Sequence, residues 1–158
     1  MESPKLTLIL GPMFSGKSTA LIENVRKYEA VGCPVLVIKP MIDQRYTKED
    51  KVVTHRYDSI SCSVASKLEA FDNNFINTFD IIAIDEGQFF PDLVPMVVQW
   101  LEILHKSILV AGLDGDYQRQ PIGQILNLIP YADHYTKKTA LCAVCKNGTP
   151  GQFTKRIV

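Results

Sequence analysis

The stretch at residues 6–19 constrains the fold of this chain more than any other part of its sequence. It reads LTLILGPMFSGKST, so an apolar, strand-like run leads into the pattern G-x-x-x-x-G-K-S and then into a helical pattern. Gly11 and Gly16 allow a tight turn in which successive backbone N–H groups face one point. The positive end of the following helix dipole strengthens this site for anions. The stretch therefore predicts an α/β fold that binds the phosphates of a nucleoside triphosphate.

Individual residues of this phosphate loop have expected roles. We expect Lys17 to reach the β- and γ-phosphates and the Ser18 hydroxyl to ligate Mg²⁺. The alternative is a glycine-containing turn that holds a lysine by chance, and the strand before it and helix after it argue against that alternative. The residues expected around the phosphates are Gly11, Pro12, Met13, Phe14, Ser15, Gly16, Lys17, Ser18 and Thr19.

The bulk composition is that of a soluble globular protein. The chain has 158 residues, and 17 basic residues balance 17 acidic ones, so no overall positive field attracts nucleic acid. No apolar run approaches the roughly 18–20 residues of a membrane helix, and the N-terminus lacks the pattern of a signal peptide. We expect a cytoplasmic protein with reduced cysteines and no nucleic-acid or membrane partner.

Apolar runs and helical patterns alternate along the chain, which predicts a mostly parallel sheet flanked by helices. The expected helices cover residues 19–32, 63–79 (capped by Ser66), 91–104 and 123–135 (broken by Pro130). The expected buried strands cover residues 34–39, 80–84 and 107–112. Residues 41–62 are polar and predict a hairpin or loop near the nucleotide. Residues 1–138 would form the nucleotide-binding domain and residues 139–158 a small β subdomain.

Acidic side chains follow two of these strands. Asp43 and Arg45 lie just past the strand at 34–39, where ligands bind in open α/β sheets, although a solvated surface pair is an alternative. Asp85 ends the strand at 80–84, as expected of a carboxylate that holds Mg²⁺, or alternatively of a cap on the next element. Its neighbour Glu86 can accept a proton from an attacking hydroxyl or water.

The residues after this acidic pair are suited to contact a substrate. Gln88 carries a donor and an acceptor that can read an amide-like edge. Phe89 and Phe90 supply flat apolar surface, and we expect one ring to pack in the core and the other to line the site.

The C-terminal segment carries a C-x-x-C pattern at Cys142 and Cys145, which is half of a zinc ribbon. A closed zinc site takes four ligands, and Cys33 and Cys62 lack the paired spacing to supply the others. From these residues alone, a zinc site and two free thiols are equally good interpretations. A strand is expected over residues 152–156.

Taken together, the motifs resemble the thymidine kinases of the zinc-bearing type, found in the cytosol and also in large DNA viruses and bacteria. The matching pieces occur in the family's order: GPMFSGKST (11–19), DQRY (43–46), DEGQFFP (85–91), LDG (113–115), QR (118–119), ILNLIP (125–130), LCAVC (141–145) and TKR (154–156).

The resemblance implies a RecA-like P-loop domain with a small zinc-ribbon-like subdomain, usually assembled as a homotetramer. It implies transfer of the γ-phosphate of ATP to the 5′-hydroxyl of thymidine with Mg²⁺, with deoxyuridine as a further candidate substrate. Glu86 would be the general base, Lys17, Ser18 and Asp85 would serve the triphosphate and metal, and Asp43 and Arg45 would help to position them. The residues implied around thymine are Met13, Phe89, Leu113, Tyr117 and Thr154, and Tyr117 replaces the phenylalanine that most of the family has.

Members of that family continue into a loop that closes over the nucleoside and into a second C-x-x-C, whereas this sequence ends at Val158. We therefore expect a truncated member, in which zinc is bound only if a second cysteine pair exists. Two other functions are alternatives. One is a P-loop ATPase or GTPase in which Glu86 activates water, and the other is an inactive nucleotide-binding module that lacks the closing loop.

Overall fold

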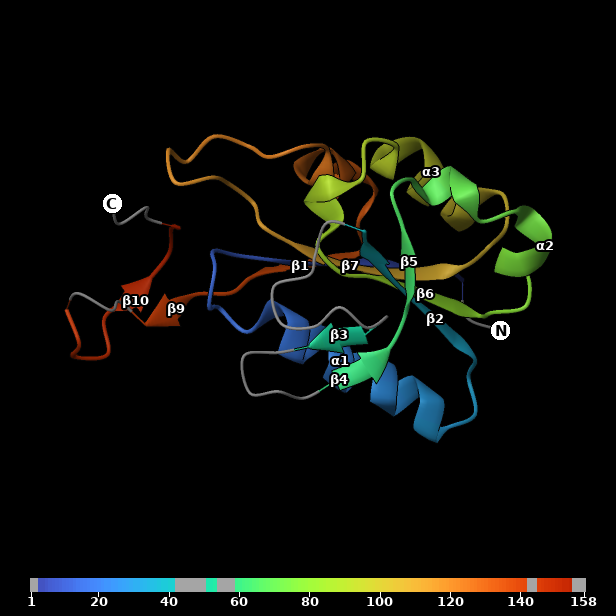
Figure 1. The fold of residues 1–158 in the computed structure, drawn as a ribbon, viewed down its shortest axis with the longest axis horizontal. Helices are drawn as coiled ribbons and strands as arrows, with labels where there is room; N and C mark the ends of the chain where they lie inside the picture. The colour runs from blue at the N-terminus through green and yellow to red at the C-terminus, as the bar shows by residue number, and fades with distance from the viewer. Residues whose placement is uncertain (1–2, 42–50, 54–58, 142–144, 155–158) are drawn as a thin grey trace.

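A six-stranded sheet forms the centre of the molecule (Figure 1). The computed structural model describes residues 3–41, 51–53, 59–141 and 145–154, and for residues 51–53 and 59 it describes the backbone alone. The strands lie in the order β5-β2-β6-β7-β1-β8, and every pairing is parallel. Their bounds are β1 Leu6–Leu10, β2 Val35–Pro40, β5 Ser63–Ala65, β6 Ile81–Ile84, β7 Ser107–Gly112 and β8 His134–Lys137. All six strands therefore end on the same side, which we call the carboxyl end of the sheet.

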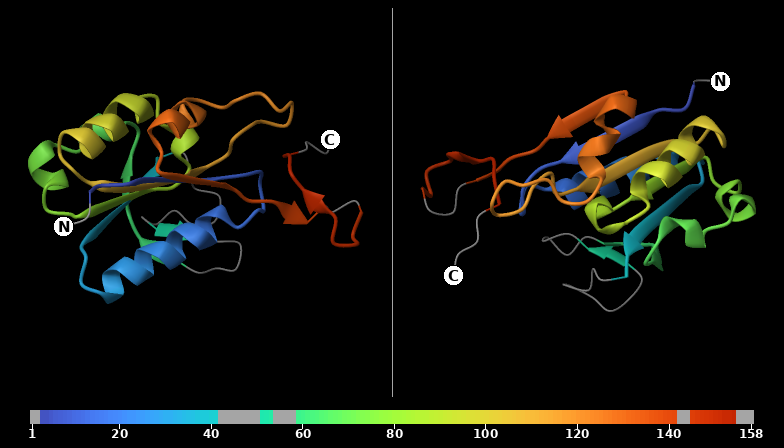
Figure 2. Two further views of the ribbon diagram at one scale, coloured as in Figure 1. Left: turned by 180° about the vertical axis from the view of Figure 1, so that it is seen from behind. Right: turned by 90° about the horizontal axis from the view of Figure 1, so that it is seen from above.

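Helices cover both faces of the sheet (Figures 1 and 2). One face carries α1 (Lys17–Ala30), and the other carries α2 (Asn73–Ile76), α3 (Leu93–Glu102) and the 3-10 helices η1 (Leu68–Ala70) and η3 (Ile125–Tyr131). Side chains of a strand alternate between the two faces. Leu8 of β1 accordingly packs in the core beneath α3, whereas its neighbour Ile9 packs in the core beneath α1. The expected α/β architecture is confirmed.

Helix α1 follows its expected pattern. Leu21, Ile22 and Val25 are buried against the sheet, as a helical stripe requires. The helix ends where Gly32 adopts a left-handed φ of 83° and donates its N–H to the Glu29 carbonyl at 3.0 Å. The phosphate loop, residues 11–18, runs from the end of β1 into the first turn of α1 and so lies at the carboxyl end of the sheet.

A short antiparallel hairpin follows β2. It pairs β3 (Lys51–Val53) with β4 (Ser59–Ser61) on the side of the sheet that carries α1 (Figure 1). Ile60 and Cys62 pack against the core beneath α1. The structure thus contains the expected hairpin.

The expected helix at residues 63–79 is wrong. Ser63–Ala65 forms β5, which pairs with the end of β2, and only η1 and the four-residue α2 follow it. The cap of α2 is Asp72, whose carboxylate accepts the Phe75 N–H at 2.8 Å, and Ser66 caps no helix among the described residues. Residues 63–65 pair with the edge of β2, and this pairing decides their conformation despite the weak helical pattern in the sequence.

The expected helix at residues 123–135 is also wrong in its second half. Residues 125–131 form the 3-10 helix η3, which accommodates Pro130, and β8 then pairs with β1. Asp133 fixes this pairing, because its carboxylate accepts the Leu6 N–H and its own N–H donates to the Leu6 carbonyl, each at 2.9 Å. The side chains of β8 are all exposed, so no apolar pattern marks the strand.

The C-terminal segment forms a second small sheet beyond the carboxyl end of the main one (Figure 1). It pairs β9 (Ala140–Leu141) with β10 (Pro150–Gly151) in antiparallel orientation. The strand expected at 152–156 is wrong for residues 152–154, which follow β10 as irregular chain. Within the described ranges, no helix is long and apolar enough to cross a membrane.

Candidate active site

The phosphate loop joins the end of β1 to the start of α1, and its two glycines are required by its shape. Gly11 has a φ of 149° and Gly16 a φ of 82°. A Cβ on Gly11 would lie 2.6 Å from the Lys138 carbonyl oxygen, so a side chain there would collide with backbone. The loop backbone therefore excludes a side chain at Gly11, and at Gly16 its left-handed conformation would strain one.

Two side chains of the loop donate to a carbonyl of the same loop. The Lys17 ammonium and the Ser15 hydroxyl each lie 2.7 Å from the Pro12 carbonyl oxygen. Lys17 is only 8% exposed. A buried ammonium at a helix N-terminus provides a concentrated positive site.

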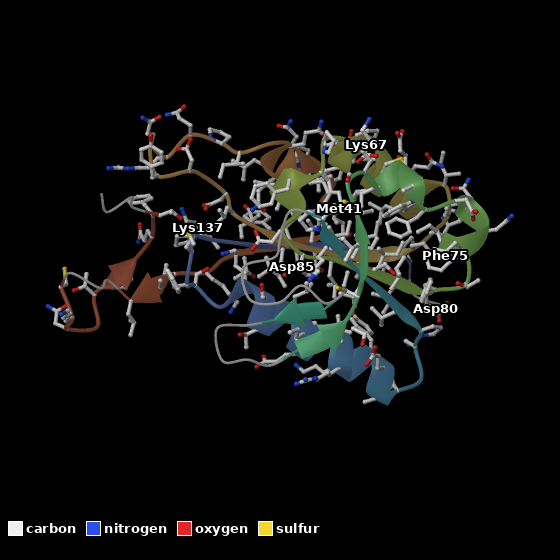
Figure 3. The ribbon with its side chains drawn as sticks, in the orientation of Figure 1. Met41, Lys67, Phe75, Asp80, Asp85 and Lys137 are labelled. Atoms are coloured by element: carbon white, nitrogen blue, oxygen red, sulfur yellow. The ribbon has the colours of Figure 1, made fainter. Side chains whose placement is uncertain are left out.

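A hydroxyl and a carboxylate meet between α1 and the end of β6. The Ser18 hydroxyl donates to Asp85, with its Oγ 3.2 Å and 3.1 Å from the two carboxylate oxygens, and Asp85 is 3% exposed. Asp80 precedes β6 and Asp85 follows it, so the two lie at opposite ends of that strand (Figure 3). Hydroxyl and carboxylate oxygens form the donor set that Mg²⁺ prefers. The Ser18–Asp85 pair therefore fits that ion, while no larger group of His, Cys, Asp and Glu suited to a metal occurs in the described residues.

The second carboxylate, on Glu86, has different partners. Glu86 has a left-handed φ of 51° and is 6% exposed. It is followed by the 3-10 helix η2 (Gly87–Phe89). Gln88 Nε2 donates to Glu86 Oε2 at 2.7 Å, and Gln88 Oε1 accepts the Leu113 N–H at 3.1 Å. One buried amide thus joins the acidic residue after β6 to the loop after β7.

The C-terminal segment returns to the phosphate loop. The Met13 N–H donates to Thr154 Oγ1 at 3.0 Å. The neighbouring Phe153 ring has the Arg119 guanidinium carbon 4.6 Å from its centroid and the Lys137 ammonium 5.2 Å from it. Lys137 also pairs with Asp114 at 2.9 Å. These contacts tie residues 152–154 to the phosphate loop, to β8 and to the loop after β7.

Comparison with known proteins shows to which family this site belongs. The family model described as thymidine kinase matches residues 4–158. The chain belongs to the thymidine kinase family. It is 45% identical over 156 residues to the thymidine kinase of Yaba monkey tumor virus, 42% over 153 to thymidine kinase a of Arabidopsis thaliana, and 40% over 163 to thymidine kinase 1 of Dictyostelium discoideum. These alignments cover 99%, 94% and 98% of this chain and 83%, 63% and 67% of the three relatives.

Solved structures share the fold at low sequence identity. A DNA replication initiation factor matches 85% of this chain and 40% of its own with a TM-score of 0.50 and 13% identity. AMPPCP-bound DnaA from Aquifex aeolicus matches 86% of this chain and 40% of its own with a TM-score of 0.51 and 14% identity. These likenesses concern the fold alone, and together with the parallel sheet they agree with the expected RecA-like architecture.

The structure of this thymidine kinase family member brings several predicted site residues together. Lys17, Ser18 and Asp85 lie at the carboxyl end of the sheet, and Met13 contacts Thr154. Of the remaining phosphate-loop residues, Phe14 is 67% exposed with a left-handed φ of 61°, and Thr19 lies in the first turn of α1.

One of the two adjacent phenylalanine rings packs in the core, as expected. Phe90 is 1% exposed and packs in the core, whereas Phe89 is 42% exposed. Tyr117 is 47% exposed on the loop after β7, which Leu113 begins. Three predicted residues, Asp43, Arg45 and Cys142, lie outside the described residues, and the second cysteine of that pair, Cys145, is exposed.

The sequence does not predict several contacts at the site that join residues far apart in the chain. Phe153 carried no functional expectation, although two cations from separate elements lie against its ring. Arg119 lies over Phe153, a contact that the motif at residues 118–119 does not indicate. The bonds of Gln88 to Glu86 and Leu113 were likewise not foreseen. No spacing rule detects such contacts, because each depends on where separate loops meet.

Proposed function

We propose that this chain is an ATP-dependent thymidine kinase that transfers the γ-phosphate of ATP to the 5′-hydroxyl of thymidine. The observation that carries the proposal is the pair of adjacent buried carboxylates after β6: Asp85 bonds to the phosphate-loop hydroxyl of Ser18, and Glu86 does not share that bond. One carboxylate is thus aligned with the phosphate loop, and the other, on the next residue, is the one we assign to the acceptor. The names of the curated relatives point to thymidine as that acceptor.

The phosphate loop binds the triphosphate through its backbone N–H groups and Lys17. In the structure the Lys17 ammonium donates to the neutral Pro12 carbonyl. A phosphate oxygen carries negative charge and is the stronger acceptor, so Lys17 exchanges this carbonyl for the β- and γ-phosphates when ATP binds. Arg45 is proposed to assist at the phosphates.

Ser18 and Asp85 would hold Mg²⁺, and Asp43 is proposed to assist them. When bound, Mg²⁺ neutralises charge on the β- and γ-phosphate oxygens. Burial of Asp85 strengthens its interaction with a cation, because water screens it little. Ser18 lies in the first turn of α1, so the same helix start orients this hydroxyl and the phosphate-binding amides.

Glu86 is the proposed general base. As the thymidine 5′-oxygen bonds to the γ-phosphorus and the bond to the β-phosphate bridging oxygen breaks, the hydroxyl proton passes to the Glu86 carboxylate and ADP leaves. The protein's main contribution is positioning and charge compensation, which buried and hydrogen-bonded side chains supply.

The proposed nucleoside site lies between the phosphate loop and the loop after β7. Support comes from the Met13–Thr154 and Gln88–Leu113 contacts and from the exposed rings of Phe89 and Tyr117. Exposed aromatic rings at this end of the sheet offer stacking surface for a base. The residues proposed to line the nucleoside site are Met13, Phe89, Leu113, Tyr117 and Thr154. Gln88, a further candidate from the sequence, bonds through its amide to Glu86 and Leu113.

Three further properties belong to the proposal. Cys142 and Cys145 would supply half of a zinc site that a second cysteine pair completes. The protein would assemble as a homotetramer and act in the cytoplasm. Metal analysis of the purified protein and sedimentation velocity test the zinc and the assembly.

The proposed function is tested by measuring ADP release with and without thymidine. A kinase releases ADP only with the nucleoside present, apart from slow background hydrolysis. An ATPase in which Glu86 activates water releases ADP at the same rate in both samples, and that result would overturn the proposal.

A further inference from the structure

Both ends of the Gln88 side-chain amide bond to the protein. Gln88 is 4% exposed, with Nε2 bonded to Glu86 and Oε1 bonded to the Leu113 N–H. The two contacts agree on how the amide is oriented. Turning it over would face its NH₂ group toward the Leu113 N–H and its oxygen toward a carboxylate oxygen, and both contacts would become repulsive.

The backbone around Gln88 leaves this side chain little freedom. A Cβ on Gly112, the last residue of β7, would lie 2.3 Å from Gln88 Oε1. A Cβ on Gly123 would lie 2.2 Å from the Gln88 carbonyl oxygen. Both approaches are closer than any side chain allows, so glycines at these points let two backbone segments close around Gln88.

We infer that Gln88 is a positioning residue, whose amide fixes the Glu86 carboxylate and links it to the loop after β7. The inference rests on the proposed function, since it takes Glu86 as the base. It assigns Gln88 a role different from contact with the nucleoside. A charge-assisted hydrogen bond of 2.7 Å removes rotational freedom from a glutamate side chain and so fixes the direction of its carboxylate.

The link has a functional consequence. The loop after β7 begins at Leu113 and carries Tyr117, two residues proposed to contact the nucleoside. Because Gln88 bonds to Leu113 as well as to Glu86, one amide couples the position of the base to the position of the nucleoside loop. A misplaced base loses rate even when both substrates bind normally.

The test begins with Gln88→Met, which keeps side-chain length and removes both hydrogen bonds. We expect kcat with thymidine to fall by about 10- to 100-fold, with KM for ATP and for thymidine changed much less. If Gln88 instead contacts the nucleoside, KM for thymidine rises while kcat is kept, and that result overturns the inference.

The matched control is Gln124→Met. Gln124 is also bonded at both ends, with Oε1 accepting the Val94 N–H at 2.9 Å and Nε2 donating to the Pro91 carbonyl at 2.6 Å. Both of these partners are backbone groups, and neither is a carboxylate. The control should lose stability like Gln88→Met and keep kcat. Equal losses of kcat in the two variants would mean that the effect is only structural.

A double variant separates positioning from direct action. If Gln88 works through Glu86, then Gln88→Met added to Glu86→Gln should lower kcat little further. If the double variant instead loses the product of the two single fold-changes in kcat, the two residues act independently and the inference is wrong. If kcat falls in Glu86→Gln but is unchanged in Gln88→Met, the inference about Gln88 is wrong and the proposed function stands. If the wild-type chain does not phosphorylate thymidine, the proposed function itself is wrong.

Two further measurements test the inference if Gln88→Met folds poorly or if the chain shows no activity. Gly112→Ala keeps the Gln88 amide but places a methyl group against its oxygen, and it should reproduce the kcat loss. Hydrogen exchange of the Leu113 N–H needs no activity and should quicken in Gln88→Met and, through the shared amide, in Glu86→Ala. Unchanged exchange in Glu86→Ala would show that the two ends of the link are independent.

Discussion

Asp85 and Glu86 are neighbours in the chain, yet their carboxylates have different partners. Asp85 accepts from Ser18, whereas Glu86 accepts from Gln88. The left-handed backbone of Glu86 separates the two side chains, since it turns the chain sharply where β6 ends. A non-glycine residue in this conformation costs about 1–2 kcal/mol. Strain of this kind is often retained at functional sites.

Glu86→Gln tests the base. It removes the proton acceptor and keeps the side-chain volume, so we expect ATP binding to persist and kcat to fall by about 100- to 10,000-fold. Single-turnover measurement of thymidine monophosphate checks this. Glu102→Gln, at the exposed end of α3, is the matched control and should keep full activity. Nearly intact turnover in Glu86→Gln would show that another group takes the proton.

Ser18→Ala tests the metal site. Loss of one oxygen ligand should raise the Mg²⁺ concentration needed for half-maximal activity by at least about 10-fold. A magnesium titration at saturating ATP and thymidine measures this shift. Ser107→Ala, whose hydroxyl accepts the Lys5 N–H at the start of β7 and so at the opposite end of the sheet, should leave the titration unchanged. An unshifted curve for Ser18→Ala would remove Ser18 from the proposed ligands.

At the scale of elements, the segment after β10 is held by contacts to three others. Thr154 bonds to the phosphate loop, and the Phe153 ring lies against Arg119 of the loop after β7 and Lys137 of β8. These contacts bring together segments distant in sequence at the carboxyl end of the sheet. The segment therefore depends on the folded domain for its position.

Phe153→Leu tests this arrangement. Each exposed cation–π contact contributes about 0.5–1 kcal/mol, so losing two should lower kcat/KM for thymidine by about 5- to 30-fold. Steady-state kinetics with thymidine varied measures the effect. Tyr131→Leu removes a half-exposed ring of η3 and should change kcat/KM little. An unchanged kcat/KM in Phe153→Leu would mean that Thr154 is held without this ring.

How far the sequence predicts the fold depends on the kind of element. The strands at the centre of the sheet were predicted because they are continuous apolar runs, as Ile81–Ile84 is. The outer strands β5 and β8 were missed, since exposed or small side chains such as those of Ser63 and His134 carry no apolar pattern. Their existence depends on pairing with a neighbouring strand, which is a property of the assembled sheet.

The same distinction holds for the site. Lys17, Ser18 and Asp85 are marked by a local motif or by their position at the end of a strand, so their meeting was predictable. The Gln88–Leu113 bond and the stacking of Arg119 on Phe153 join residues 25 and 34 positions apart. Such contacts follow from loop conformation, which local patterns do not determine.

At the scale of the whole molecule, two hydrophobic cores lie on the two faces of one sheet. Leu8 in the middle of β1 is fully buried beneath α3, and Ile9 beside it packs beneath α1. Because β1 also leads into the phosphate loop, the strand connects the stability of both cores with the geometry of the site.

Leu8→Ala tests this dependence. The cavity should lower the free energy of unfolding by about 2–5 kcal/mol. Urea unfolding followed by fluorescence of Trp100, the single tryptophan, measures it. Leu141→Ala is the control, since Leu141 is 74% exposed and its loss should change stability by less than about 0.5 kcal/mol. Equal stability of the two variants would contradict the assigned core.

The central claim is that the carboxyl end of this sheet transfers a phosphoryl group to thymidine. Its most direct test is product analysis with ATP and Mg²⁺ and a panel of thymidine, deoxyuridine, deoxycytidine, deoxyadenosine and deoxyguanosine. We predict thymidine 5′-monophosphate as the main product, with one ADP formed for each monophosphate. Formation of ADP without any nucleoside monophosphate, or equal phosphorylation of all five nucleosides, would contradict the claim.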